Sequence, residues 1–220
     1  MEKNRRLPVL LAYATILTLL IASGVSCVSG VAAYDVSAAN GLPRTQSEFR
    51  AYITPQCAQV VETLGSILGE PPYEISQTGF DNIRNWVADN IDYMSDEKRS
   101  GRDYWQTPRE TLQLGTGDCE DFAILLCSLL RAYGISAEQV YVAIGLDDGE
   151  EPGHAFVVED WNRDGRWQRV ESQAPAQLSS RRSWLRAPRP HPDSELDKYE
   201  ITAAFNDLYY YDASFPWDEG

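Results

Sequence analysis

The sequence contains few of the residues that build metal clusters and disulfide frameworks. Its 220 residues include four cysteines and two histidines. There is no CxxC pair and no cysteine and histidine cluster at zinc-ligand spacing, which excludes a structural zinc site of that kind. Beyond residue 33 the cysteines are Cys57, Cys119 and Cys127, too few and odd in number for a disulfide scaffold. A single bridge between Cys57 and Cys127 is left open.

Positive charge is also scarce. The chain has 19 Lys and Arg against 33 Asp and Glu, a net charge of −14, and only three of the basic residues are lysines. Removing residues 1–33 takes away three basic residues and one acid, which leaves 16 and 32 and a net charge near −16. Nucleic acid is therefore not an expected partner. An acid excess of this size suits a soluble surface outside the cell.

The amino-terminal stretch is typical of an export segment. Lys3, Arg5 and Arg6 precede a run over 7–33 that has no charged residue. This run predicts cleavage after the small residues 31–33, an uncleaved anchor of roughly 40 Å at about 1.5 Å per residue, or lipidation at Cys27. In each case the basic start favours an extracytoplasmic domain, membrane-anchored through this segment or secreted after cleavage.

The rest of the chain reads as helices followed by strands. We expect residues 34–79 to form a linker and N-terminal helices, 80–175 a core, and 176–220 an extension packed on that core. Apolar spacing and caps predict helices over 47–53, from Thr54-Pro55 onward, and over 80–93. Alternating runs predict strands over 139–146, 154–161 and 166–172. The expected class is α+β, with an antiparallel sheet behind a helix.

Residues 107–134 predict two consecutive helices. Thr107 begins a capping box with a proline in the first turn, and Gly115 ends that helix; a second runs over 119–133 and is closed by Gly134. Cys119 lies in the first turn of the second helix, where backbone N–H groups and the helix dipole stabilise a thiolate.

The composition around Cys119 leaves two interpretations open. Cys127 lies two turns further along among leucines, where a cysteine acts as a small core residue, and Cys119 can be read in the same way. Asp118, Glu120 and Asp121 flank Cys119, and their charges disfavour a thiolate. As a nucleophile, Cys119 therefore needs a base.

A histidine and an acid that can serve Cys119 as base and as orienting carboxylate follow later in the sequence. His191 lies in a proline-rich stretch and reads as a loop residue, whereas His154 opens the strand over 154–161. A hairpin turn around 162–165 pairs residues whose numbers sum to roughly 327, which brings Glu171 within reach of His154. Asp160 lies six residues along the same strand, about 20 Å away. Glu171 is therefore the better partner for the imidazole.

Three stretches in this order carry a family resemblance. "WQTPRETLQLGTGDCEDFAILLCSLLRAYGI", then "GHAFVVEDW", then "WQRVES" resemble the transglutaminase-like superfamily of papain-type thiol enzymes, particularly its microbial exported members, over roughly residues 80–175. The resemblance implies a papain-like fold with Cys119 as nucleophile, His154 as base and Glu171 as the group that holds the imidazole. The family more often has aspartate at this last position. The implied chemistry is acyl transfer from an amide through a thioester to water or an amine.

Two further sets of residues are candidates around this triad. Trp105 or Gln106 is a candidate donor to the oxyanion, although both positions also suit packing. The residues over 160–171 match the calcium loop of an EF-hand without its helical flanks, and a polar hairpin turn is the preferred explanation of them. Because Glu171 cannot serve both sites, the calcium candidates are the remaining acidic and amide side chains: Asp160, Asn162 and Asp164.

The sequence thus predicts an exported thiol enzyme that acts on a protein or peptide substrate. It requires no cofactor, with calcium as an optional ligand, and it contacts a membrane only through its N-terminal segment. The alternative is a non-catalytic envelope module on the same fold that binds protein and is stabilised by calcium.

Overall fold

Helices form the first part of the described chain and a sheet forms the second. The computed structural model describes residues 42–99, 101–147, 153–163, 165–173 and 199–212, all within one unit over 34–220. The helices are α1 (Gln46–Ala51), α2 (Ala58–Leu68), α3 (Gln77–Asn90), α4 (Asp96–Arg99), α5 (Pro108–Leu114) and α6 (Cys119–Tyr133). The strands are β1 (Asp92–Tyr93), β2 (Thr116–Gly117), β3 (Val140–Asp147), β4 (His154–Glu159), β5 (Gln168–Val170), β6 (Tyr199–Phe205) and β7 (Tyr210–Asp212).

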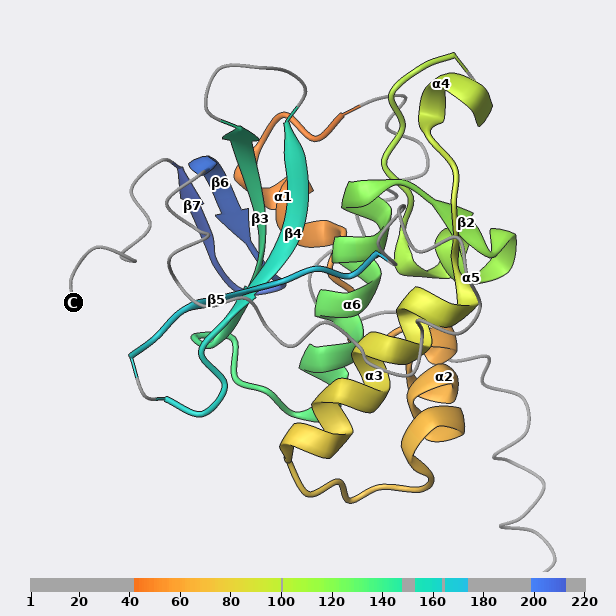
Figure 1. Cartoon of the computed structure of the whole chain (residues 1–220), viewed down its shortest axis with the longest axis vertical. Helices are drawn as coiled ribbons and strands as arrows, with labels where there is room; N and C mark the ends of the chain where they lie inside the picture. The colour runs from red at the N-terminus through yellow and green to blue at the C-terminus, as the bar shows by residue number, and fades with distance from the viewer. Residues whose placement is uncertain (1–41, 100, 148–152, 164, 174–198, 213–220) are drawn as a thin grey trace, which may run out of the picture. The chain divides into compact units, whose positions relative to one another are not determined.

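Helix α6 is the centre of the fold. Figure 1 shows it between the sheet on one side and α2, α3 and α5 on the other. Every residue from Glu120 to Leu130 is buried, so the helix is enclosed all round rather than along one stripe. Its predicted limits are confirmed: it begins at Cys119 and ends at Gly134, a left-handed cap with φ 113°. The preceding capping box at Thr107 and the left-handed Gly115 are confirmed as well.

The sheet has the strand order β5-β4-β3-β6-β7, and all its pairs are antiparallel. In the β4–β5 hairpin Val157 pairs with Val170, Val158 with Arg169 and Glu159 with Gln168. Each pair sums to 327, so the register predicted from the hairpin turn is confirmed. The α+β class with an antiparallel sheet behind α6 is confirmed too.

The C-terminal strands were not anticipated from the sequence, which predicted only packing for this region. Strand β6 pairs with β3 in the middle of the sheet, and β7 forms the edge beyond it. Ala204 and Phe205 are fully buried. The turn between the two strands is tied to α6 by Arg131, whose Nε donates to Asp207 at 2.6 Å. The extension therefore completes the sheet.

The start of α2 differs from the prediction. The sequence places Thr54-Pro55 at the beginning of this helix, but α2 begins at Ala58 with Cys57 as its cap. The cause is a turn in which the N–H of Cys57 donates to the carbonyl of Thr54 at 3.0 Å. Proline fixes the φ angle of such a turn as readily as that of a first helical residue.

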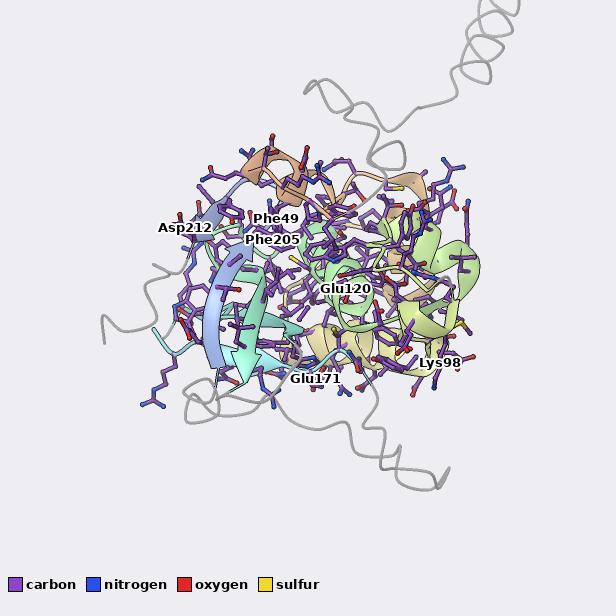
Figure 2. All side chains as sticks on the ribbon, turned by 90° about the horizontal axis from the view of Figure 1, so that it is seen from above. Phe49, Lys98, Glu120, Glu171, Phe205 and Asp212 are labelled. Atoms are coloured by element: carbon purple, nitrogen blue, oxygen red, sulfur yellow. The ribbon has the colours of Figure 1, made fainter. Side chains whose placement is uncertain are left out.

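Aromatic rings join the first helix to the sheet. Figure 2 labels Phe49 of α1 beside Phe205 of β6, and their ring centroids lie 5.2 Å apart. Trp105 packs against both rings, 5.6 Å from Phe49 and 6.0 Å from Phe205. Within the residues that the structure describes, no helix is long and apolar enough to cross a membrane, and the N-terminal segment over 1–33 lies outside them.

Candidate active site

Cys119 is the first residue of α6 and lies against the beginning of β4. Its half-buried thiol lies near the N–H of Ala155, the residue that follows His154, and this N–H favours the thiolate form. The sulfur in turn donates to Oε2 of Glu120 at 3.2 Å. Burial raises the pKa of this thiol, and the neighbouring Glu120 raises it further, while the Ala155 N–H opposes the shift. In this arrangement the thiol keeps its proton, so a base must remove it during any attack.

His154 and Glu171 are brought together as the hairpin register predicts. Nε2 of His154 lies 3.0 Å from Oε2 of Glu171. His154 is the first residue of β4, and Glu171 follows directly after the last residue of β5. The carboxylate can therefore fix the orientation and the tautomer of the imidazole beside the thiol-bearing end of α6.

Two arginines surround Glu171. Nη1 of Arg169 in β5 lies 3.3 Å from Oε2 of the glutamate, the same oxygen that meets His154. Arg84 of α3 donates through Nε to the main-chain carbonyl of Glu171 at 2.8 Å. The negative charge of the carboxylate is thus compensated on two sides.

The residues before α5 are engaged in packing and in structural hydrogen bonds. Trp105 is buried in the aromatic cluster with Phe49 and Phe205. Gln106 is fully buried, and its side-chain amide donates to the carbonyl of Thr116 at 3.1 Å and to Asp121. Both donors of the amide are therefore engaged, which leaves the role of Trp105 and Gln106 at the oxyanion a prediction.

Asp121 holds this segment against the start of α6. Its carboxylate accepts from the main-chain N–H of Gln106 at 2.6 Å and from the N–H of Asp118 at 3.3 Å. The pKa of Asp121 is raised to about 7, mainly by burial and also by the charge of Asp118, although the Gln106 donors oppose the shift. Burial and the charge of Asp118 also raise the pKa of Glu120. Figure 2 looks onto this end of α6, with Glu120 near the centre.

The same carboxylates form a set of oxygen donors suited to a metal ion. One oxygen each of Asp118, Glu120 and Asp121 lies within 4.8 Å of the others, and Glu120 makes a second such group with Asp96 and Asp103. Oδ1 of Asp118 is buried without a hydrogen-bond partner, so this oxygen can accept a metal ion. Calcium prefers an all-oxygen site of this kind.

The calcium candidates from the sequence lie elsewhere, at the β4–β5 turn. Asp164 is outside the described residues. Asp160 accepts from the N–H of Gly165 at 3.2 Å, and Asn162 lies in the same turn. Glu171, the twelfth position of the calcium pattern, is directed at His154 instead. The hairpin has Gly165 at a positive φ of 79°, and calcium binding by Asp160, Asn162 and Asp164 stays a prediction.

Cys57 and Cys127 are thiols rather than a disulfide. Cys127 is completely buried in the core. The thiol of Cys57 donates to Oε1 of Gln59 at 3.0 Å. Both therefore fit the reading of small core residues that the sequence allowed for cysteines away from the helix start.

The roles of Arg84 and Arg169 beside Glu171 were not predicted from the sequence. Arg84 interrupts the apolar face of α3, because it follows Ile83 and lies one turn before Val87. A charge on such a face is a visible sign of a buried polar contact. Asp118, Glu120 and Asp121 raise the pKa of the Cys119 thiol or cap α6, as their sequence positions suggest, and their clustering at one helix end also fits a cation.

Comparison with known proteins agrees with this architecture. The sequence profile of the Transglutaminase-like superfamily matches residues 68–172. No curated protein matches the chain in sequence. LapG of Legionella pneumophila, solved after EGTA treatment, aligns over 78% of this chain and 80% of its own at 16% identity and a TM-score of 0.52. Its calcium-bound form aligns over 79% and 83% at 17% identity and a TM-score of 0.51.

The chain therefore has the transglutaminase-like, papain-like fold of a superfamily of thiol enzymes, and the resemblance recognised in its sequence is confirmed.

Proposed function

We propose that this protein is a thiol enzyme that cleaves peptide or amide bonds with Cys119, His154 and Glu171. The main support is the 3.0 Å contact between Nε2 of His154 and Oε2 of Glu171, at the strand start whose next N–H meets the Cys119 thiol. A nucleophile at a helix start, a base and an orienting acid are the three roles that acyl transfer requires.

In the proposed reaction His154 removes the thiol proton, and the sulfur of Cys119 forms a bond to the carbonyl carbon of the substrate. The carbon–nitrogen bond then breaks, the imidazolium proton passes to the leaving amine, and a thioester remains on Cys119. His154 next deprotonates water or an amine, which attacks the thioester and releases the thiol. The main-chain N–H of Cys119, at the positive end of α6, stabilises the oxyanion.

Alkylation of the folded domain by iodoacetamide near pH 6, followed by mass spectrometry, tests this proposal. We expect selective labelling of Cys119 that is abolished in His154→Ala. Cys57 and Cys127 are internal controls, because both thiols are buried. If all three cysteines are equally unreactive, the proposed enzymatic function is contradicted and a non-catalytic module that binds protein is favoured. A parallel assay of peptide hydrolysis and of amine incorporation then identifies the acyl acceptor.

We also propose that calcium binds at the start of α6 rather than at the β4–β5 turn. Three buried carboxylates with a partnerless Asp118 oxygen support this, and Legionella pneumophila LapG has been solved in a calcium-bound form. A bound calcium would be held by Asp118, Glu120 and Asp121. Its charge would offset the acids next to the thiol.

Calorimetry with calcium on Asp118→Asn and on Asp160→Asn distinguishes the two locations. We expect Asp118→Asn to weaken binding at least tenfold, because a charged ligand is lost, and Asp160→Asn to bind as the unmodified chain does. The reverse result would return the site to the hairpin. If the unmodified chain gives no heat of binding at millimolar calcium, both calcium sites are ruled out.

The site of action that we propose is outside the cytoplasm, with protein or peptide substrates. The basic start and the uncharged run over 7–33 support export. Fractionation of cells that express the whole chain tests this, and N-terminal sequencing of the exported form distinguishes cleavage from anchoring. Recovery of the intact chain in the cytoplasm alone would contradict it.

A further inference from the structure

Arg84 is a buried charge in the packing of α3. Its side chain is only 6% exposed, and its neighbours Ile83 and Val87 are fully buried. Burial lowers the pKa of its guanidinium, an effect that the charges of Glu171, Asp89 and Asp81 oppose. In the described part of the chain no carboxylate oxygen lies within 4.0 Å of the guanidinium. A buried arginine without a close ion pair is costly, so its contacts call for a specific reason.

The main contact of Arg84 is with the backbone of Glu171. Nε donates to the carbonyl of Glu171 at 2.8 Å, and Nη1 donates to Oδ1 of Asn85 at 3.2 Å. Strand β5 ends at Val170, so Glu171 has no rung of the β4–β5 ladder to fix it. Arg84 supplies the main-chain hydrogen bond that the ladder does not provide at this residue.

The carboxylate of Glu171 also lies in the field of Arg84. Oε2 of Glu171 meets His154 and Arg169, whereas Oε1 is buried without a partner. Nη2 of Arg84 is likewise buried without a partner. A buried acceptor and a buried donor that carry opposite charges favour each other even beyond contact distance. Arg84 thus stabilises the ionised form of the Glu171 carboxylate and also holds Glu171 in position.

We infer that Arg84 is a positioning residue of the proposed active site. It holds the backbone of Glu171 at the end of β5 and compensates its charge, so that Glu171 can orient the imidazole of His154. The inference rests on the proposed function of the triad.

The test compares Arg84→Met with Arg131→Met. Arg131 is a partly buried arginine that donates, like Arg84, to a main-chain carbonyl; it also pairs with a carboxylate, that of Asp207, at the far end of α6. Both variants lose a guanidinium from the interior, and we expect both to lower Tm. Only Arg84→Met should slow the alkylation of Cys119, by roughly tenfold to 100-fold, since a displacement of about 1 Å in an active site costs up to about 100-fold in rate.

A second measurement separates positioning from general loosening of the fold. The proton on Nε2 of His154, hydrogen-bonded to Glu171, gives a far-downfield NMR resonance that Glu171→Gln identifies by its change. We expect this resonance to shift or disappear in Arg84→Met and to persist in Arg131→Met. With a cleavable peptide, Arg84→Met should lower kcat and leave KM nearly unchanged, because Arg84 does not touch the substrate.

The outcomes distinguish this inference from the proposed function. A reactive Cys119 in the unmodified chain, with unchanged reactivity and an unchanged His154 resonance in folded Arg84→Met, overturns the role of Arg84 alone. An unreactive Cys119 in the unmodified chain overturns the proposed function itself. Should Arg84→Met not fold, Arg84→Gln takes its place: we expect an intermediate loss of rate, and a full rate with an unchanged resonance overturns the inference.

Discussion

His154 and Glu171 meet at 3.0 Å although neither belongs to a rung of the β4–β5 ladder. The last rung pairs Val157 with Val170, three residues beyond His154. The glutamate therefore reaches the imidazole from the end of its strand, across a gap that the additional methylene of its side chain helps to span. The family more often has aspartate, a side chain one methylene shorter, in this role.

This relationship predicts a graded response at position 171. Glu171→Gln removes the charge and leaves an amide that stabilises the imidazolium poorly, and we expect kcat to fall by about 100-fold or more. Glu171→Asp withdraws the carboxylate by about 1.5 Å and should give an intermediate kcat. The measurement is kcat/KM on a cleavable peptide, with circular dichroism to confirm folding. A fully active Glu171→Gln would show that His154 works without an orienting acid.

The close contact between the backbone of Gly117 and Asp121 of α6 predicts that position 117 tolerates no side chain without a loss of stability. A Cβ at this position would lie 2.6 Å from the Cβ of Asp121, closer than packed atoms approach. We expect Gly117→Ala to cost roughly 1–3 kcal/mol of unfolding free energy, because the crowded backbone must shift. Gly65→Ala is the matched control: nothing lies within 4 Å of its Cβ in α2, so a gain of up to about 1 kcal/mol is expected. Equal stability of the two variants in urea titration would refute the close approach.

The acids at the start of α6 predict that the metal-free protein is more stable at pH 5 than at pH 8. The pKa of Asp121 is about 7 in the fold, against about 3.9 for an unfolded aspartate. Between these values the folded chain binds the proton more tightly, so stability falls as pH rises towards 7 and is lost above it. Burial raises the pKa values of Glu120, Asp96 and Asp103 in the same direction.

Thermal unfolding at several pH values, with EGTA and with calcium, checks this expectation. Since about 1 kcal/mol moves the Tm of a domain of this size by roughly 2–4 °C, a fall of several degrees from pH 5 to pH 8 is expected without calcium. Calcium should raise Tm more at pH 8, where it does not compete with protons for the carboxylates. A Tm that rises from pH 5 to pH 8 in EGTA would contradict the buried cluster.

Removal of the C-terminal strands should unfold the domain. A chain that ends at Gln173 lacks β6 and β7, loses the buried Phe205 and leaves β3 with one unpaired edge. We expect loss of cooperative thermal unfolding, because burial of a single large apolar side chain contributes about 1.5–3 kcal/mol. A chain that ends at Asp212 keeps every described strand and should unfold with the Tm of the full chain. Cooperative unfolding of the shorter chain would mean that the sheet is complete without β6.

Local signals predicted the nucleophile helix and the hairpin well. Capping residues and glycines act within a few residues, so the bounds of α6 follow from Asp118 and Gly134 alone. The hairpin register follows from the turn and from the twofold alternation of a strand. The sequence order of Cys119, His154 and Glu171 was then sufficient to propose the triad.

The contacts that surround the triad depend on the tertiary fold and were not predictable in this way. Arg84 and Glu171 are 87 residues apart, and only the packing of α3 against the end of β5 joins them. Likewise, alternation in "YEITAAF" does not reveal that β6 pairs with β3. Gln106 looked available for the oxyanion because its partner Asp121 lies 15 residues away, across the turn into α6.

The position of β6 has a consequence for the order in which the molecule is made. On a ribosome, Cys119, His154 and Glu171 all emerge before residues 199–205, yet the sheet beneath them is incomplete until those residues pair with β3. A nascent chain that ends at β5 exposes the long edge of β3 and cannot hold its thiol and imidazole in a fixed frame. Synthesis thus delays the assembly of this candidate active site until residues 199–205 have been added and have paired with β3.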